Sequence, residues 1–94
     1  MRLTLLMLLI TCAPAMAQVN YRFECSKADA EPAVVAVKYS RSGSPVPCEV
    51  NYTVNGNTEA LWSASVKSGY CEAKAEAFIK QQRQLGWRCV KQGK

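Results

Sequence analysis

The sequence lacks histidine entirely and contains a single aspartate, Asp29. Histidine is the usual general base near neutral pH and a frequent zinc ligand, so sites of both kinds must use other residues or be absent. The remaining acid–base candidates are glutamates, of which Glu72 and Glu76 share one face of an expected helix and could form a carboxylate pair. We favour a simpler interpretation, because acidic side chains in the first turns of a helix complement its dipole. We therefore predict a protein that is not an enzyme and holds no metal or other cofactor.

Length and hydropathy exclude further classes. The 94 residues, 49% hydrophobic and 20% charged, are typical of one small globular domain. A Rossmann domain, a TIM barrel or a protein kinase needs a longer chain. No apolar run is long enough to cross about 30 Å of hydrocarbon, so we expect no transmembrane segment.

Residues 1–17 have the organisation of a secretory signal peptide. Arg2 provides a positive charge, residues 3–10 are apolar except for one threonine, and small residues stand at Ala15 and Ala17. We predict cleavage after Ala17, a single domain at residues 18–94, and a periplasmic or secreted location. An alternative is lipid attachment at Cys12, because the residues before it loosely resemble a lipoprotein signal.

Export changes the interpretation of the cysteines, because disulfides form in oxidising compartments. Removal of the signal peptide leaves four cysteines, spaced 23, 23 and 18 residues apart: Cys25, Cys48, Cys71 and Cys89. Zinc sites usually bring two cysteines within about two to four residues of each other, and thiol oxidoreductases use a C-x-x-C motif. Neither spacing occurs, so the pattern predicts two structural disulfides.

Alternation of apolar and polar residues predicts antiparallel strands followed by one helix. Strands are expected at residues 19–25, 34–39, 48–54 and 58–66, with a short extended segment at residues 87–90. Ser68 or Gly69 can cap the helix, which ends at Gly86. The sequence thus indicates an α+β fold, in which a small antiparallel four- to five-stranded sheet has one C-terminal helix packed on one face.

The apolar side of this helix is expected to face the sheet. The residues that recur at three- and four-residue spacing are Cys71, Ala75, Phe78, Gln82 and Leu85. Glutamine is the one polar member of this inward stripe.

Asn55-Gly56 is a strong hairpin signal, because both residues tolerate positive φ. A two-residue loop would pair Val50 with Leu61. A three-residue loop with a bulge at Asn57 would pair Val50 with Trp62, and we favour this register. That register also pairs Ala60 with Tyr52 and Ala64 with Cys48. A slip of one residue would exchange the two faces of the returning strand.

The order of the elements selects among the three possible cysteine pairings. If the first four strands form an up-and-down meander, Cys25 and Cys48 lie at opposite ends of the sheet. The fourth strand returns to the end that holds Cys48, so the helix begins there with Cys71, and Cys89 follows the other end of the helix. The favoured pairs are therefore Cys48–Cys71 and Cys25–Cys89, because a Cys71–Cys89 bridge would have to span a helix of about 20 Å.

Several short motifs stand out: Pro47-Cys48-x-Val50-x-Tyr52, Leu61-Trp62-x-Ala64, Gly69-Tyr70-Cys71-Glu72-x-Lys74-Ala75 and Gly86-Trp87-x-Cys89. In these motifs the chain resembles a family of small, functionally uncharacterised exported proteins of Gram-negative bacteria. The resemblance implies a periplasmic location and a scaffold held by disulfides, without implying an activity.

The first part of the mature chain contains Tyr21-x-x-x-Cys25 and Val35-x-Val37-x-Tyr39. Here it resembles periplasmic C-type lysozyme inhibitors, which open with a similar pair of strands. In those inhibitors a Ser-Gly-x-x-Tyr loop enters the cleft of the enzyme. Ser68-Gly69-Tyr70 lacks that spacing.

Aromatic and basic residues provide the candidates for a binding surface. Trp62, Tyr70 and Trp87 could anchor a protein partner, since Trp and Tyr dominate interface hot spots, although both tryptophans also suit a core. The net charge is +5, and basic residues gather in the last quarter of the chain, where Arg83 and Arg88 could attract an anionic partner.

We predict a small exported non-catalytic binding module, acting as a periplasmic protein-binding accessory or inhibitor. The alternative is a binder of the envelope surface or of an anionic ligand, such as lipopolysaccharide or a glycan, that uses the basic C-terminal quarter. We expect no nucleic-acid partner, because the density of positive charge is modest and the protein is exported.

Overall fold

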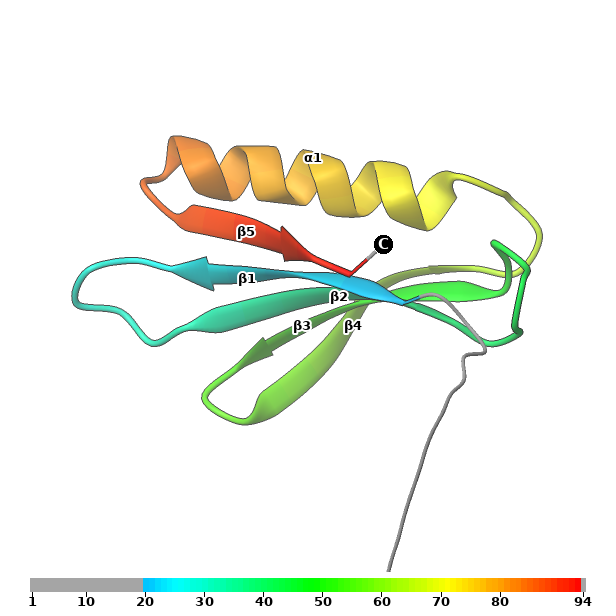
Figure 1. Cartoon of the computed structure of the whole chain (residues 1–94), viewed down its shortest axis with the longest axis horizontal. Helices are drawn as coiled ribbons and strands as arrows, with labels where there is room; N and C mark the ends of the chain where they lie inside the picture. The colour runs from blue at the N-terminus through cyan, green and yellow to red at the C-terminus, as the bar shows by residue number, and fades with distance from the viewer. Residues whose placement is uncertain (1–19, 94) are drawn as a thin grey trace, which may run out of the picture.

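The computed structural model describes residues 20–93, which contain five strands and one helix (Figure 1). In chain order these are β1 (Tyr21–Ser26), β2 (Ala33–Tyr39), β3 (Cys48–Val54), β4 (Asn57–Ala64), α1 (Tyr70–Gln84) and β5 (Arg88–Gln92). The α+β class predicted from the sequence is confirmed. The predicted signal peptide, its cleavage site after Ala17 and the alternative lipid site at Cys12 lie outside the described residues.

The strands form one antiparallel sheet in the order β4-β3-β2-β1-β5. The first four lie side by side in chain order, which confirms the expected meander. β5 follows the helix and pairs with β1, and α1 lies along one face of the sheet (Figure 1). Within residues 20–93 no helix is long and apolar enough to cross a membrane.

The core lies between α1 and the sheet face toward which every second strand residue points. The buried strand residues on this face are Tyr21, Phe23, Cys25, Ala33, Val35, Val37, Cys48, Val50 and Cys89. From the helix side, Cys71, Ala75 and Ile79 are buried against them. The positions between the buried strand residues are more exposed, as expected for a sheet with a helix on one face only.

The inward stripe of the helix differs from the expected one. Cys71 and Ala75 are buried as predicted, and Phe78 packs at the margin of the core. The centre of the contact is Ile79, with 0% of its surface exposed, whereas Leu85 is 59% exposed. The buried side chains follow a constant four-residue spacing, and Leu85 is the C-cap residue, beyond the last helical turn that contacts the sheet.

The β3–β4 hairpin contains the predicted pair of Val50 with Trp62, but its bulge lies elsewhere. The loop is the two residues Asn55-Gly56, with φ of 55° and 77°. The extra residue is Leu61, which has no partner in the ladder. The predicted bulge at Asn57 is therefore wrong, because the turn itself is tight and the register shift occurs in the middle of β4.

The position of the bulge changes which side chain faces the helix. Between the turn and the bulge, Tyr52 pairs with Glu59 and not with Ala60. Glu59 therefore lies on the same side of the sheet as Tyr52. Beyond the bulge Ala64 pairs with Cys48 as expected. A single extra residue thus changes the alternation of β4, so that odd-numbered residues before the bulge and even-numbered residues after it point toward the helix.

Both predicted disulfides are present. Cys48–Cys71 joins the start of β3 to the first turn of α1, and Cys25–Cys89 joins the paired strands β1 and β5. All four cysteines are buried. The beginning of the helix and the final strand are thus each tied covalently to the sheet, which limits the freedom of the unfolded chain.

Candidate functional site

The structure divides the five predicted binding residues into two groups. Trp62 and Tyr70 lie near the first half of α1, where they share a neighbour in Lys74. Arg83, Trp87 and Arg88 lie at the end of α1 and in the segment that follows it. The two groups are therefore considered as separate surfaces.

The three side chains of the second group do not point toward one common surface. Nη2 of Arg83 donates a hydrogen bond of 2.8 Å to the carbonyl oxygen of Cys89, so this guanidinium holds β5 against the helix. Trp87 is half-buried at the core margin, with Nζ of Lys27 5.9 Å from its ring centroid. Arg88 precedes the buried Cys89 in β5, so it points to the opposite face of the sheet.

Trp62 and Tyr70 belong to an aromatic strip, which we define as Tyr52, Trp62, Tyr70 and Phe78. The ring centroid of Phe78 lies 5.4 Å from that of Tyr52 and 6.0 Å from that of Trp62. The interplanar angles of 74° and 70° are the edge-to-face arrangement that aromatic quadrupoles favour. All four rings pack against the core but are only partly buried.

Two lysines lie over this strip. Nζ of Lys74 is 5.6 Å from the ring centroids of both Trp62 and Tyr70, and Nζ of Lys67 is 5.7 Å from that of Tyr70. Ammonium groups at such distances are attracted by the negative face of a ring. The four-residue spacing of Tyr70 and Lys74 was visible in the sequence. The contact between Lys74 and Trp62, in contrast, depends on the register of β4.

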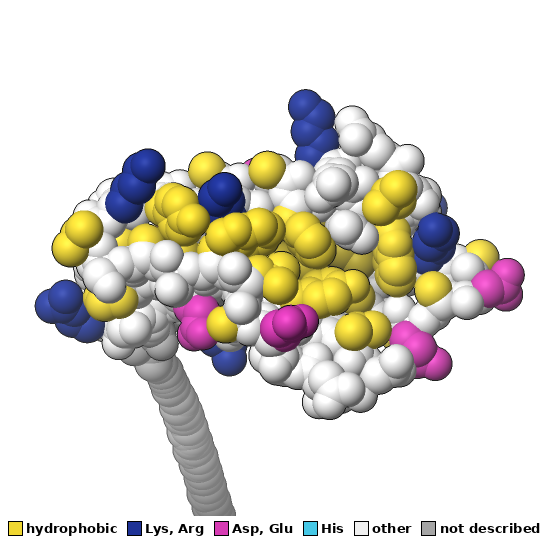
Figure 2. All heavy atoms as spheres, turned by 180° about the vertical axis from the view of Figure 1, so that it is seen from behind, with side chains coloured by type: hydrophobic (Ala, Val, Ile, Leu, Met, Phe, Trp, Pro, Cys, Tyr) yellow, Lys and Arg dark blue, Asp and Glu magenta, His cyan; other side chains and the backbone are white. Residues whose placement is uncertain are grey.

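Figure 2 shows the face of the molecule that is turned away in Figure 1, with hydrophobic side chains gathered in a band between helix and sheet. The aromatic strip belongs to this side, because it joins α1 to β3 and to β4, which is one edge of the sheet. A contiguous apolar surface of this kind is typical of an interaction site.

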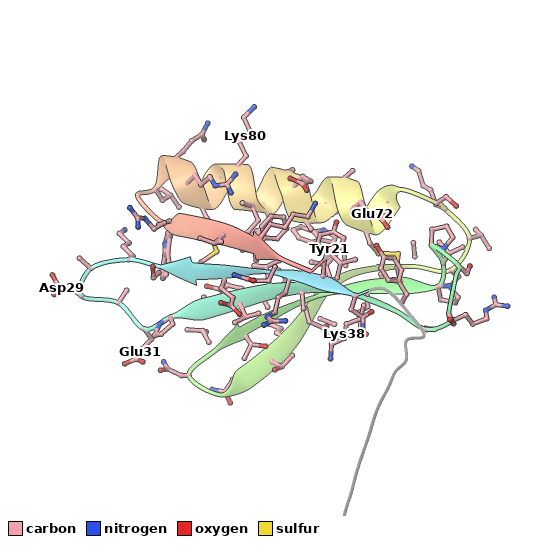
Figure 3. All side chains as sticks on the ribbon, viewed as in Figure 1. Tyr21, Asp29, Glu31, Lys38, Glu72 and Lys80 are labelled. Atoms are coloured by element: carbon pink, nitrogen blue, oxygen red, sulfur yellow. A yellow bond between two sulfur atoms is a disulfide. The ribbon has the colours of Figure 1, made fainter. Side chains whose placement is uncertain are left out.

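A cavity of about 470 Å³ lies on the other side of α1. It is bounded by Tyr21 and Tyr39 of the sheet, by the loop after β2, and by Glu72 and Glu76 of the helix. Figure 3 shows Tyr21 pointing from β1 toward α1, with Glu72 near the start of the helix. The helical period separates these glutamates from Tyr70 and its strip, so the cavity and the strip flank the buried line of α1.

Within residues 20–93, the hydrogen bonding of one carboxylate at this cavity, that of Glu72, is incomplete. The hydroxyl of Tyr39 donates to Oε2 of Glu72 at 2.6 Å. Oε1 of Glu72 is buried and has no hydrogen-bond partner among residues 20–93. Glu76 has a cation nearby, with Oε2 3.8 Å from Nζ of Lys91. The carboxylate pair suggested by the sequence therefore exists as two separate contacts at one cavity.

The same environment changes the acidity of the two phenols. Burial, followed by the negative charges of Glu72 and Glu76, raises the pKa of Tyr21 to about 12. Burial and the hydrogen bond to Glu72 also raise the pKa of Tyr39. Both side chains keep their protons at neutral pH, and the hydroxyl of Tyr39 donates there to Glu72. The sequence analysis placed both tyrosines in expected strands, but it did not connect either of them with a glutamate.

No group of three or more histidine, cysteine, aspartate or glutamate side chains in residues 20–93 is arranged to hold a metal ion. Comparison with protein-family models, with curated protein sequences and with solved structures finds no match. The function of this chain must therefore be inferred from its own side chains.

Proposed function

We propose that this protein is a small exported, non-catalytic binding module that docks a protein partner on the aromatic strip. The observation that carries the proposal is the placement of four partly buried rings in one strip, with two lysine ammonium groups over Trp62 and Tyr70. Burial of the exposed ring surface by a partner would contribute about 25 cal/mol per Å². Tyrosine and tryptophan in such positions are frequent hot spots of protein interfaces.

The charges around the strip define the partner that fits it. Lys67 and Lys74 lie at the end of the strip near Tyr70, whereas Glu59 lies beside Tyr52 at the other end. We infer a protein segment with an aromatic or large aliphatic anchor and carboxylates on one side of it. The carboxylates would face the two lysines and avoid Glu59, which gives the bound segment one orientation.

Export is part of the proposal. Two buried disulfides support an oxidising compartment, such as the periplasm or the exterior of the cell. The signal-like residues 1–17 and the resemblance to exported proteins of Gram-negative bacteria agree with this location. An accessory subunit or an inhibitor would both use a rigid scaffold of this size.

The alternative proposal is an anionic envelope polymer bound by the basic C-terminal quarter. Arg88 favours it, because its side chain is exposed on the face of the sheet opposite the helix. Arg83 supports it less, since its guanidinium already donates to the carbonyl of Cys89. Such binding would rest on exposed charges and would weaken steeply as salt is added.

The two proposals are separated by charge reversal within one helix. The oxidised protein would be cross-linked to its partner in an envelope extract, and the affinity of the captured partner would then be measured for Lys74→Glu and Lys80→Glu. Lys80 is the matched control, because it is exposed on the same helix and points away from the sheet (Figure 3).

For a partner docked on the strip we expect Lys74→Glu to weaken binding by about tenfold or more, equivalent to about 1.4 kcal/mol, and Lys80→Glu to leave it within about twofold. Equal effects of the two variants would contradict docking on the strip. Capture of a polymer that is released between low and physiological salt would favour the alternative.

A further inference from the structure

The cavity beside Glu72 is separate from the aromatic strip and is large enough for a ligand of its own. Its volume of about 470 Å³ lies within the range of small-molecule sites. Its walls come from β1, β2, the loop after β2, α1 and β5, so residues far apart in the sequence meet here. The disulfide Cys48–Cys71 holds the adjacent turn of α1 in place.

Lys91 shows which chemical group these walls accept. Its Nζ lies 4.6 Å from the ring centroid of Tyr21 and 5.9 Å from that of Phe23. The same nitrogen is 3.8 Å from Oε2 of Glu76. An aromatic face attracts an ammonium group, and a carboxylate beside the ring adds an opposite charge. The chain thus places a cation of its own beside Glu76 at one wall of the cavity.

Within residues 20–93, Glu72 forms no ion pair with an equivalent cation. Its Oε2 accepts the hydroxyl of Tyr39, and its Oε1 is buried without a donor among residues 20–93. Two basic residues line the cavity. Lys91 is placed at Glu76, and the guanidinium of Arg41 forms no ion pair within residues 20–93. A carboxylate oxygen that is withdrawn from water normally accepts a hydrogen bond.

We propose that this cavity binds a primary ammonium group, with Glu72 as its counter-ion and Tyr39 as the side chain that orients the carboxylate. The group could belong to a free amine or to a lysine side chain of a peptide, and the chemistry of the contact is the same for both. A compact ammonium has three donors, enough for the carboxylate of Glu72 and the hydroxyl oxygen of Tyr39.

Other cations fit less well. A guanidinium binds best through two parallel hydrogen bonds to both oxygens of a carboxylate, but Oε2 of Glu72 is already engaged by Tyr39. A quaternary ammonium carries no N–H and would leave the carboxylate unsatisfied. The cavity should therefore distinguish n-butylammonium from guanidinium and from tetramethylammonium.

The experiment is a titration of the oxidised protein followed by NMR chemical shifts. The probes are n-butylammonium, N-acetyl-lysine amide, guanidinium and tetramethylammonium, each raised to several tens of millimolar because a single charged contact gives dissociation constants of about 1 mM or weaker. We expect saturable shifts at Tyr39, Ser44 and Glu72 with the first two probes only. Tighter binding of the free amine or of the lysine amide then identifies the natural source of the group.

Two variants and one control make the assignment specific. Glu72→Gln should weaken binding of n-butylammonium by about tenfold or more, whereas Glu49→Gln, which changes a residue facing away from the helix between the buried Cys48 and Val50, should leave it unchanged. Lys91→Met should strengthen binding severalfold, because it removes a competing positive charge and frees Glu76. Lys91 is half-exposed, so this variant remains informative even where Glu72→Gln does not fold.

The proposal is overturned by an absence of saturable shifts with either primary amine, or by equal binding of tetramethylammonium. It is also overturned by a Lys91→Met variant that binds amines no better than the original protein.

Discussion

The hydrogen bond between Tyr39 and Glu72 can be removed with little change in shape. Tyr39→Phe deletes only the hydroxyl that donates to Oε2 of Glu72 at 2.6 Å. Since Oε1 already has no partner among residues 20–93, the variant leaves both carboxylate oxygens without a donor there. Tyr52→Phe is the matched control, because Tyr52 is also half-buried in the sheet, and within residues 20–93 its contact is a ring contact with Phe78.

The expected loss follows from the kind of bond. A hydrogen bond to a charged group contributes about 1.5–3 kcal/mol to the free energy of unfolding. For a domain of this size the dependence on urea is about 1 kcal/mol per molar, so Tyr39→Phe should lower the unfolding midpoint by about 1.5 M or more. Tyr52→Phe should change the free energy of unfolding by no more than about 0.5 kcal/mol.

A double-mutant cycle with Glu72→Gln isolates the pair. An amide oxygen can still accept from the hydroxyl of Tyr39, but a bond between neutral groups contributes only about 0.5–1.5 kcal/mol. The coupling between Tyr39→Phe and Glu72→Gln should therefore be about 1 kcal/mol. Urea unfolding monitored by circular dichroism at neutral pH measures all four proteins. If Tyr39→Phe and Tyr52→Phe have the same effect, or if the coupling is zero, the hydrogen bond does not stabilise the fold and the reasoning is refuted.

Three further perturbations test the fold. Ile79→Ala should lower the free energy of unfolding by about 2–5 kcal/mol and Leu85→Ala by about 0.5 kcal/mol or less, because the first side chain is 0% and the second 59% exposed; similar urea midpoints would contradict the helix contact. Joint replacement of Cys48 and Cys71 by alanine should cost about 3–4 kcal/mol, most of the stability of a small domain, so a variant that still melts cooperatively near the original temperature would show that this disulfide matters little. The pKa of Tyr21, raised from 10.0 to about 12, means that the folded protein keeps a phenol proton that the unfolded chain loses; the stabilisation is complete below about pH 10 and is lost as pH rises to 12. Tyr21→Phe should reduce this alkaline loss of stability, and an unchanged pH profile would exclude Tyr21 as its source.

The cysteine pairing is a long-range feature that local sequence patterns predicted correctly. The alternation of residues defined the strands, and the short connections between them favoured a meander. Once the first four strands run up and down in order, the two ends of the sheet are assigned and only one pairing brings all four cysteines together. Both disulfides follow from this argument, and both are present. Long-range structure was predictable here because each step relied on neighbours in the sequence.

The β3–β4 hairpin was predicted only in part from local sequence patterns. The signal at Asn55-Gly56 identified a turn, and Val50 does pair with Trp62. The extra residue, however, is Leu61 in the middle of β4 and not Asn57 beside the turn. Both arrangements give the same pair at Val50, so the pattern of apolar residues beyond the bulge could not distinguish them. The difference decides that Glu59 lies beside Tyr52, at one end of the aromatic strip.

The candidate sites depended still more on tertiary packing. Trp62, Tyr70, Glu72 and Glu76 were recognised in the sequence as residues of interest. Their partners were not, because Lys74 contacts Trp62 across two elements and Tyr39 reaches Glu72 from 33 positions away in the chain. The periodicity of one strand or helix does not indicate which residues of another element it contacts.

The amino-acid sequence by itself determined the class of the fold, the chain order of strands and helix, and the pairing of cysteines, because each depends on periodicity, turn residues and short connections. Only the tertiary structure decided which side chains meet. The position of one bulged residue, the line along which α1 contacts the sheet, and the closure of β5 against β1 are results of packing among all the elements at once. Those three features place two lysines over the aromatic strip and leave one buried carboxylate oxygen, Oε1 of Glu72, without a partner among residues 20–93 beside a cavity.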